Sequence, residues 1–394
     1  MAVLTPTAQP AAALPAAPLP AVGRGPVARV RAPLQGEGVA VAALWRELWD
    51  AHQAWGGYPG SHDDAVYARV AARLDDDARV RAGRALLGSH AHLIADLDGA
   101  PCGQVEGWIE RQGWGASAQL TCEVRSLVVR DRARSLGLGR ALLDTLEKAT
   151  LSLVPAPPPA TLAHTALSSP MPGARCVLAA EVLEPNPAHS FYARVGFVPV
   201  AWNAGLDAAS GARLRGDASA PAYVARWAGA SDASAVARLE GILAERRRQS
   251  GDARFDAPRA IDPAILAAIA AHLAAVAREQ GDSATLVAVD RTGIVRGAAS
   301  VVVQTLDPPF LPVRRALVGR FALDPVCAPA GLIAPLVALG CRFAESRGAS
   351  RVELTDLTAP GTALHDAALA IGARPWSRVV IRRSPVPCPS QPHG

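Results

Sequence analysis

The chain has 394 residues, 50% of them apolar, and a formal net charge of +5 at pH 7, so two domains with separate cores are expected. Its positive charges are scattered arginines, and the densest run, Arg246 to Arg248, is expected on a solvated helix face, which argues against a nucleic-acid partner. Widely spaced cysteines without a CxxC pair predict reduced thiols, a cytoplasmic location and no metal. No apolar run long enough for a membrane span occurs, so no membrane partner is expected.

The first half of the chain predicts a mixed α/β layer. Residues 1–25, rich in Ala and Pro, are expected to form a disordered tail before a domain at 26–203. Residues 154–173 have the Pro- and Ser-rich composition of an inserted loop, and residues 204–220 that of a linker. The expected elements are a strand at Ala28–Ala32 followed by a helix, strands at His92–Leu97, Gly103–Glu110 and Gln119–Val129, a helix at Gly139–Thr150, a strand at Arg175–Leu183 and a helix at Pro187–Arg194.

The second half repeats the first. Arg31, Glu37, Val41 and Leu44 recur at the same intervals as Arg226, Asp232, Val236 and Leu239. This predicts a second domain at 221–384 and a disordered tail at 385–394, although Tyr223–Ala228 is also compatible with the last strand of the first half. The remaining expected elements are strands at Thr285–Asp290, Arg296–Gln304 and Arg315–Leu323, a helix at Leu332–Arg347, a strand at Ser350–Asp356 and a helix at Thr362–Ala370.

The segment from Thr121 to Ala149 is the most informative stretch for chemistry. An alternating strand runs into Arg134-Ser-Leu-Gly137-Leu-Gly139, which opens an amphipathic helix. Free backbone N–H groups at such a helix start, with glycines that allow close approach, bind phosphate oxygens, so a ligand carrying a diphosphate is predicted. Leu142 stands where a dinucleotide fingerprint needs its third glycine, and no Gly-Lys-Ser/Thr of a P-loop is present.

The pattern V-x-x-x-x-R-x-x-G-x-G from Val129 to Gly139 closely resembles motif A of the GNAT N-acetyltransferase superfamily. Glu184–Phe197 resembles its motif B, and Asp131 departs from the proline that many members carry. The resemblance implies two tandem GNAT-like domains, each a central mixed sheet flanked by helices. It further implies acetyl-CoA as co-substrate, held between two splayed parallel strands.

The resemblance also assigns residues to this co-substrate. The backbone of Leu127, Val128 and Val129 would hold the pantetheine arm, with the Val129 N–H directed at the thioester oxygen. Asn186 would contact the same arm. The pyrophosphate would lie on Arg134, Ser135, Leu136, Gly137, Leu138, Gly139 and Arg140.

Direct attack by a neutral amine needs a base for the amine and an acid for the leaving thiolate. Glu123 stands where histone-type members of the superfamily place their glutamate base, and Tyr192 stands where motif B often places the acid. Each residue has an alternative interpretation. Glu123 is also typical of a solvated edge or an ion-pair partner, and the ring of Tyr192 is also compatible with simple packing near the cofactor sulfur.

The second copy lacks these groups, so we expect a degenerate domain that does not bind acetyl-CoA productively. It would instead close one side of the acceptor cleft or hold a different ligand. The residues opposite Glu123, Arg134, Gly139, Asn186 and Tyr192 are Leu317, Ala328, Ile333, Thr362 and Ala368.

The acceptor is expected to be a small-molecule or protein amine, bound along residues 45–80. Aromatic and acidic side chains there suit a cationic amine through cation–π contacts and charge pairing. The favoured alternative is that the tryptophans pack on the core and the aspartates flank a solvated helix. The side chains in question are Trp45, Trp49, Trp55, Tyr58, Asp63, Asp64 and Asp75 to Asp77, while Trp108 and Trp114 on the next hairpin are equally unspecific.

Three acceptor classes stay open. In order of preference they are a small amine or aminoglycoside-like antibiotic, an amino-sugar thiol precursor, and a protein amino group. The rival hypothesis is a non-catalytic acyl-CoA sensor or interaction module. The chain is expected to be a monomer or a homodimer.

Overall fold

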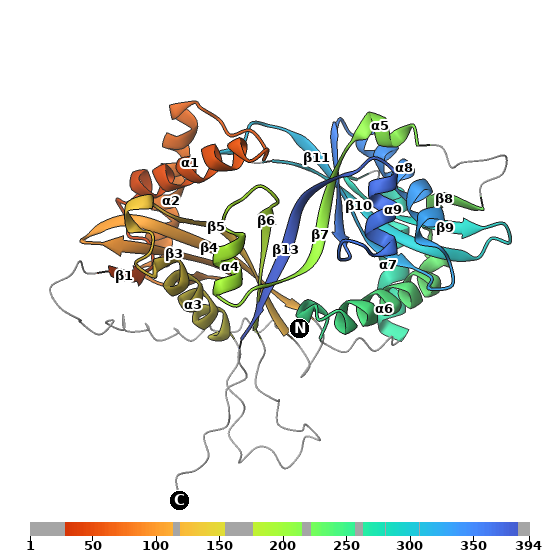
Figure 1. The fold of residues 1–394 in the computed structure, drawn as a ribbon, viewed down its shortest axis with the longest axis horizontal. Helices are drawn as coiled ribbons and strands as arrows, with labels where there is room; N and C mark the ends of the chain where they lie inside the picture. The colour runs from red at the N-terminus through yellow and green to blue at the C-terminus, as the bar shows by residue number, and fades with distance from the viewer. Residues whose placement is uncertain are drawn as a thin grey trace, which may run out of the picture.

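A computed structural model describes residues 28–112, 119–153, 176–214, 222–256, 263–279, 281–306 and 308–384. The expected tails, the insertion at 154–173, Trp114 and the end of the expected linker lie outside these ranges. The fold is a mixed α/β structure, as the sequence predicted, but the strands form one large sheet, where the sequence predicted a separate sheet in each half. Figure 1 shows two halves side by side, which we call the first half (28–214) and the second half (222–384).

The elements of the first half include two that the sequence did not predict, at 86–87 and 208–212, and those predicted with bounds agree to within a few residues at each end. They are β1 (Ala28–Arg31), α1 (Gly38–Ala54), α2 (Asp64–Arg81), β2 (Leu86–Leu87), β3 (His90–Leu97), β4 (Ala100–Gln112), β5 (Gln119–Val129), α3 (Leu138–Leu151), β6 (Cys176–Leu183), α4 (His189–Arg194), β7 (Val198–Asp207) and α5 (Ala208–Ala212).

The second half follows the same order. Its elements are β8 (Tyr223–Trp227), α6 (Ala233–Gln249), α7 (Pro263–Glu279), β9 (Ser283–Asp290), β10 (Val295–Thr305), β11 (Arg314–Leu323), α8 (Pro329–Ser346), β12 (Arg351–Leu357), α9 (Ala363–Ala370) and β13 (Arg374–Arg383). β8 pairs with β9, so Tyr223–Trp227 opens the second half and does not end the first.

The two halves share one sheet because they exchange their last strands. The strand order is β1-β3-β4-β5-β6-β13-β7-β12-β11-β10-β9-β8, with β2 paired to β3. β5 and β6 are parallel, as are β11 and β12, and the other pairs are antiparallel. β13 of the second half therefore lies against β6 of the first, and β7 lies against β12. Figure 1 shows β7 and β13 crossing the middle of the molecule together.

Because of this exchange, part of the segment expected to be a linker belongs to the shared sheet. Residues 204–207 continue β7, where they pair with both β12 and β13, and residues 208–212 form α5. The polar, Gly-containing composition of residues 204–220 suggested a linker, but the pairing partners of β7 come from the other half of the chain. A boundary at 203 would therefore cut through a strand that belongs to the shared sheet.

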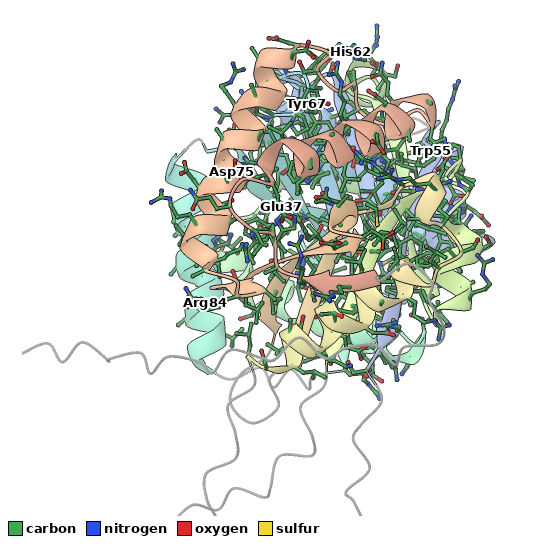
Figure 2. The ribbon with its side chains drawn as sticks, turned by 90° about the vertical axis from the view of Figure 1, so that its left-hand side faces the viewer. Glu37, Trp55, His62, Tyr67, Asp75 and Arg84 are labelled. Atoms are coloured by element: carbon green, nitrogen blue, oxygen red, sulfur yellow. The ribbon has the colours of Figure 1, made fainter. Side chains whose placement is uncertain are left out.

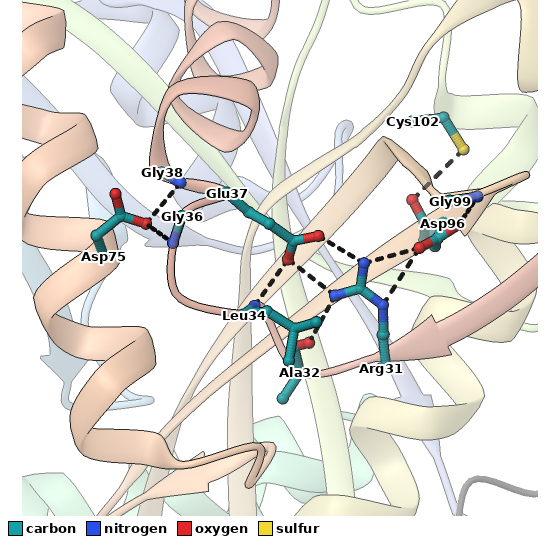
Figure 3. Close-up of polar contacts among 11 residues, drawn as sticks. Arg31, Ala32, Leu34, Gly36, Glu37, Gly38, Asp75, Asp96, Gly99 and Cys102 are labelled. Atoms are coloured by element: carbon teal, nitrogen blue, oxygen red, sulfur yellow. Dashed lines mark hydrogen bonds and ion pairs between the residues drawn. The ribbon is translucent and has the colours of Figure 1, made fainter.

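The repeated Arg–acid pair is a structural link between a strand and the helix that follows it. Arg31 donates to both carboxylate oxygens of Glu37 at 2.8 and 2.6 Å and to Asp96, and Glu37 also accepts from the Leu34 amide (Figure 3). Arg226 binds both oxygens of Asp232 in the same way, at 2.7 and 2.8 Å. The repeat thus preserves the geometry with which each half enters its first helix.

Two apolar layers sandwich the sheet of the first half. On one face α3 packs through Leu142, Leu143 and Leu146 against alternate residues of β3 to β6. On the other face α1 and α2 pack against each other and on Ile94. Because side chains alternate along a strand, the residues of β5 and β6 that do not face α3 point toward the side of α1 and α2. Figure 2 views the molecule from the left-hand side of Figure 1, with Trp55, Tyr67 and Asp75 labelled.

Candidate functional site

A cavity of about 2260 Å³ connects the two halves. Its lining includes the end of β5, the first turn of α3, β6, α4 and the end of α1 from the first half. The second half contributes the end of β10, the loop that follows it, and one or two residues each from β11, β12 and β13. The cavity therefore combines the segment expected to bind acetyl-CoA with side chains from the copy expected to be inactive.

The central feature of the cavity is the separation of β5 from β6. The last pair in their ladder joins Val124 to Ala180, and beyond it both strands continue to line the cavity. A bulge lies at this point, since Ser126 has a φ of +53° and the pairing of β5 with β4 shifts register there. Leu127, Val128 and Val129 follow the bulge and border the opening between the strands.

The start of α3 has the geometry of an anion-binding turn. Gly137 has a φ of +77° and precedes the helix, and Ser135 has a φ of +68°. The Ala141 amide donates to the Gly137 carbonyl, so the amides ahead of Ala141 belong to the first turn, whose N–H groups point away from the helix. Leu138 and Gly139 line the cavity there. A Cβ at Gly139 would lie 2.9 Å from the Phe191 ring, so only glycine fits.

Arginines surround this turn. Arg134 is 67% exposed, donates from Nε to the Val129 carbonyl at 3.2 Å and pairs with Asp131. Arg140 donates to the Arg194 carbonyl at 3.1 Å. Leu136 is exposed, outside the core. The arginines and the first-turn amides together give this mouth of the cavity a positive potential suited to phosphate groups.

Asn186 lies opposite this turn, at the entrance to α4. Its side-chain oxygen accepts from the Ala188 amide at 2.8 Å, and its own amide donates to the Leu183 carbonyl. Asn186 lines the cavity with its amide NH₂ available beside the end of β6. The sequence-based assignment to the cofactor arm is compatible with this place and stays a prediction.

The two candidate catalytic residues lie in different environments. Glu123 lines the cavity with its side chain 49% exposed, and Arg125 donates to both of its carboxylate oxygens. Tyr192 is buried among Phe191 and Phe197, and burial raises the pKa of its phenol. A phenol that stays protonated is compatible with the role of a general acid. The ion pair of Glu123 with Arg125 is compatible with the alternative interpretation, in which Glu123 is an ion-pair partner and not a base.

The expected acceptor segment forms a wall of the same cavity. Trp45, Trp49, Trp55 and Tyr58 all line it. The aspartates mostly have structural partners instead: Asp63 caps α2, Asp64 pairs with Arg46, Asp75 accepts from the amides of Gly36 and Gly38 (Figure 3), and Asp76 pairs with Arg79, whereas Asp77 lines the cavity. Four of the five aspartates therefore have the structural role at the flanks of helices that the alternative interpretation described.

The second half holds this wall in place. Ser61 donates its amide to the Pro309 carbonyl at 2.7 Å, and Leu311 donates to the Pro59 carbonyl at 3.0 Å. The Phe310 ring packs against Trp49 with centroids 4.4 Å apart. Described residues of the loop between β10 and β11 therefore line one side of the cavity.

Two acidic residues of the cavity were missed by sequence reasoning, of which Glu353 is buried and Glu181 is exposed. Glu181 in β6 and Glu353 in β12 both line the cavity, and Glu353 is paired with Arg315 and hydrogen-bonded by the Tyr58 hydroxyl. The sequence held a signal for Glu181, which is the one carboxylate in the apolar strand CVLAAEVL. A second pair joins His90 and Glu106 at 3.3 Å. Burial raises the pKa of Glu106 and the neighbouring His90 lowers it, and the net effect is a decrease.

The second half keeps the bulge but not the anion-binding turn. Arg320, which corresponds to Ser126, has a φ of +54°. However, α8 starts earlier than α3 does, with Pro329 in its first turn, and proline has no N–H to offer. The amide of Gly331, which corresponds to Gly137, donates to Ala328, and the Tyr223 ring would contact a Cβ there. These features support the expectation that this half does not bind acetyl-CoA.

Within the described ranges, no three His, Cys, Asp or Glu side chains are grouped as a metal site would need. No helix in those ranges is both long and apolar enough to cross a bilayer.

Comparison with known proteins gives a family match over part of the chain. Residues 88–199 match the model of the acetyltransferase (GNAT) domain, whereas a search of curated protein sequences found no match. Among solved structures, the chain is similar to a GCN5-related N-acetyltransferase from Sphaerobacter thermophilus, with 17% identity, 91% of this chain and 95% of that chain covered, and a TM-score of 0.49. It is also similar to a tandem GNAT protein from the clavulanic acid biosynthesis pathway, with 17% identity, 92% and 100% covered, and a TM-score of 0.46.

Proposed function

We propose, from the premise that residues 88–199 form a GNAT domain, that this chain is an acyl-CoA-dependent N-acyltransferase whose chemistry lies in the first half. Acetyl-CoA is the donor we favour, and a primary amine is the acceptor. The observation that carries the proposal is the first turn of α3, which opens into the large cavity at the place where β5 and β6 separate.

The donor would lie along the separated strands. The first-turn amides from Ser135 to Arg140 would bind its pyrophosphate, and Leu127 to Val129 its pantetheine arm. The Val129 N–H would donate to the thioester oxygen, where negative charge grows during attack. Tyr192, kept protonated by its burial, would give its proton to the departing thiolate.

A charge placed at Gly137 tests the proposal. A Cβ at Gly137 would meet no atom within 4 Å, so the variant Gly137→Asp adds a carboxylate with little steric conflict. Asp and Asn both tolerate the left-handed conformation of this position better than other residues do. Gly137→Asn is therefore a control of equal size without the charge.

We expect Gly137→Asp to bind acetyl-CoA at least about tenfold more weakly than Gly137→Asn in isothermal titration. This is the effect expected for the loss of a charge-assisted contact with a phosphate group. Unchanged affinity in Gly137→Asp would contradict the proposed donor site. Release of CoA in the presence of a panel of amines then separates the enzyme from the sensor. Tight donor binding without turnover on any amine would favour a non-catalytic acyl-CoA sensor.

A further inference from the structure

Glu181 occupies a distinctive position in the cavity. It is the first residue of β6 beyond the ladder with β5, because the last pair joins Val124 to Ala180. Its neighbours Ala180 and Val182 belong to the core under α3, so the Glu181 side chain points to the opposite face, toward the acceptor side. The carboxyl group therefore lies where the separated strands would hold the reacting end of the donor.

The exchanged strands hold the carboxyl group of Glu181. Asn203 of β7 donates to it from Nδ2 at 2.9 Å, and the Ser377 hydroxyl of β13 also donates to it. Asn203 accepts from the Asp356 amide at 3.0 Å, which fixes the direction of its side-chain amide. Both donors exist at this place only because β13 and β7 lie between β6 and β12.

Glu181 differs from the neighbouring Glu353 in its charge balance. Arg315 lies 3.3 Å from Glu353 and compensates its charge. None of the ion pairs recorded among the described residues involves Glu181. The surrounding protein, and then the nearby Glu353, raise the pKa of Glu181, whereas hydrogen bonds from Ser377 and Asn203 and the charge of Arg315 lower it, with a net increase. Glu181 is exposed in the cavity, where Arg315 acts on both carboxylates, so a cationic ligand group would be stabilising beside them.

We propose that Glu181 binds the ammonium group of the acceptor, in a subsite that strands β7, β12 and β13 complete. This inference rests on the proposed function and deepens it. The same wall of the cavity carries Trp49, Tyr58, Phe310 and Trp376. The acceptor class that fits is a primary amine on a compact aromatic or aliphatic body.

The subsite also accounts for the protons of the reaction. The ammonium nitrogen gives one proton to the Glu181 carboxylate, and the neutral amine then forms a C–N bond to the acyl carbon while the C–S bond breaks. The second proton of the nitrogen passes to Tyr192 as Tyr192 gives its own to the CoA thiolate. Glu181 returns its proton to solvent after product release.

The test uses 2-phenylethylamine as the probe and needs no donor. Isothermal titration into the full chain is compared with titration into Glu181→Gln, which keeps the shape of the side chain and its ability to accept from Asn203. We expect the affinity to fall about 10- to 100-fold in the variant, as for loss of a bond to a charged group. The neutral 2-phenylethanol should bind both proteins equally.

Two controls make the result decisive. Glu245→Gln, on an exposed face of α6, should bind the amine as the unaltered chain does. Thermal unfolding and acetyl-CoA affinity of Glu181→Gln should match those of the unaltered chain, which shows that the fold and the donor site persist. Equal binding of the amine to both proteins, or no binding to the unaltered chain, would overturn the subsite. Loss of donor binding in Gly137→Asp but not in Gly137→Asn supports the proposed function whichever way this test ends.

Discussion

The exchange of strands makes a residue near the C-terminus part of the first half, and Ile381→Ala tests this consequence. Ile381 in β13 is fully buried and packs with Val177 and Ala179 of β6 and with Val200 of β7. The substitution removes three carbons, worth about 2–3 kcal/mol of transfer free energy, and leaves a cavity that raises the loss to about 3–4 kcal/mol. That is a large part of the roughly 5–15 kcal/mol that stabilises a typical domain.

Urea denaturation measures the loss of free energy of unfolding, and amide hydrogen exchange locates it. We expect the amides of β6 to lose as much protection as those of β13, because one sheet joins them. Val302→Ala, at a 41% exposed position of β10, deletes a similar side chain and should cost less than about 1 kcal/mol. A loss confined to the second half, with β6 unaffected, would refute the coupling of the two halves through β13.

Three further predictions concern the cavity. Gly139→Ala should destabilise the fold by about 1–3 kcal/mol and weaken acetyl-CoA binding, because the added Cβ would lie 2.9 Å from the Phe191 ring. Adding Phe191→Leu to this variant should restore the midpoint of urea unfolding. Tyr192→Phe should lower kcat while leaving acetyl-CoA affinity unchanged, and an equal kcat would remove the acid role. Burial lowers the pKa of His52 to about 4, so as the pH falls the unfolded chain takes up this proton before the folded chain does. The contribution of His52 to the free energy of unfolding should therefore be complete above pH ~6.5 and decrease by up to about 3 kcal/mol as the pH drops toward 4. Urea titrations at each pH should show that His52→Gln has lost this part of the pH dependence.

Local patterns determined most of the elements and the residues of the proposed donor site. The spacing of apolar residues gave the strands and helices, and the run from Arg134 to Gly139 placed a glycine turn at a helix start, where the structure has it. The repeat of Arg31 and Glu37 as Arg226 and Asp232 identified two halves, and both pairs form. These features depend on residues close together in the chain, so the sequence alone could reveal them.

The partners of β7 and β13 were decided only by the tertiary structure. Both strands carry the alternation of a sheet strand, and that pattern is the same whether a strand pairs within its own half or with the other. Ser377 and Glu353 come to Glu181 from strands of the other half, and Asn203 from the following strand of the same half. In the sequence, Glu181 is only one acid in an apolar strand. Its chemical surroundings depend on long-range pairing, which no local pattern encodes.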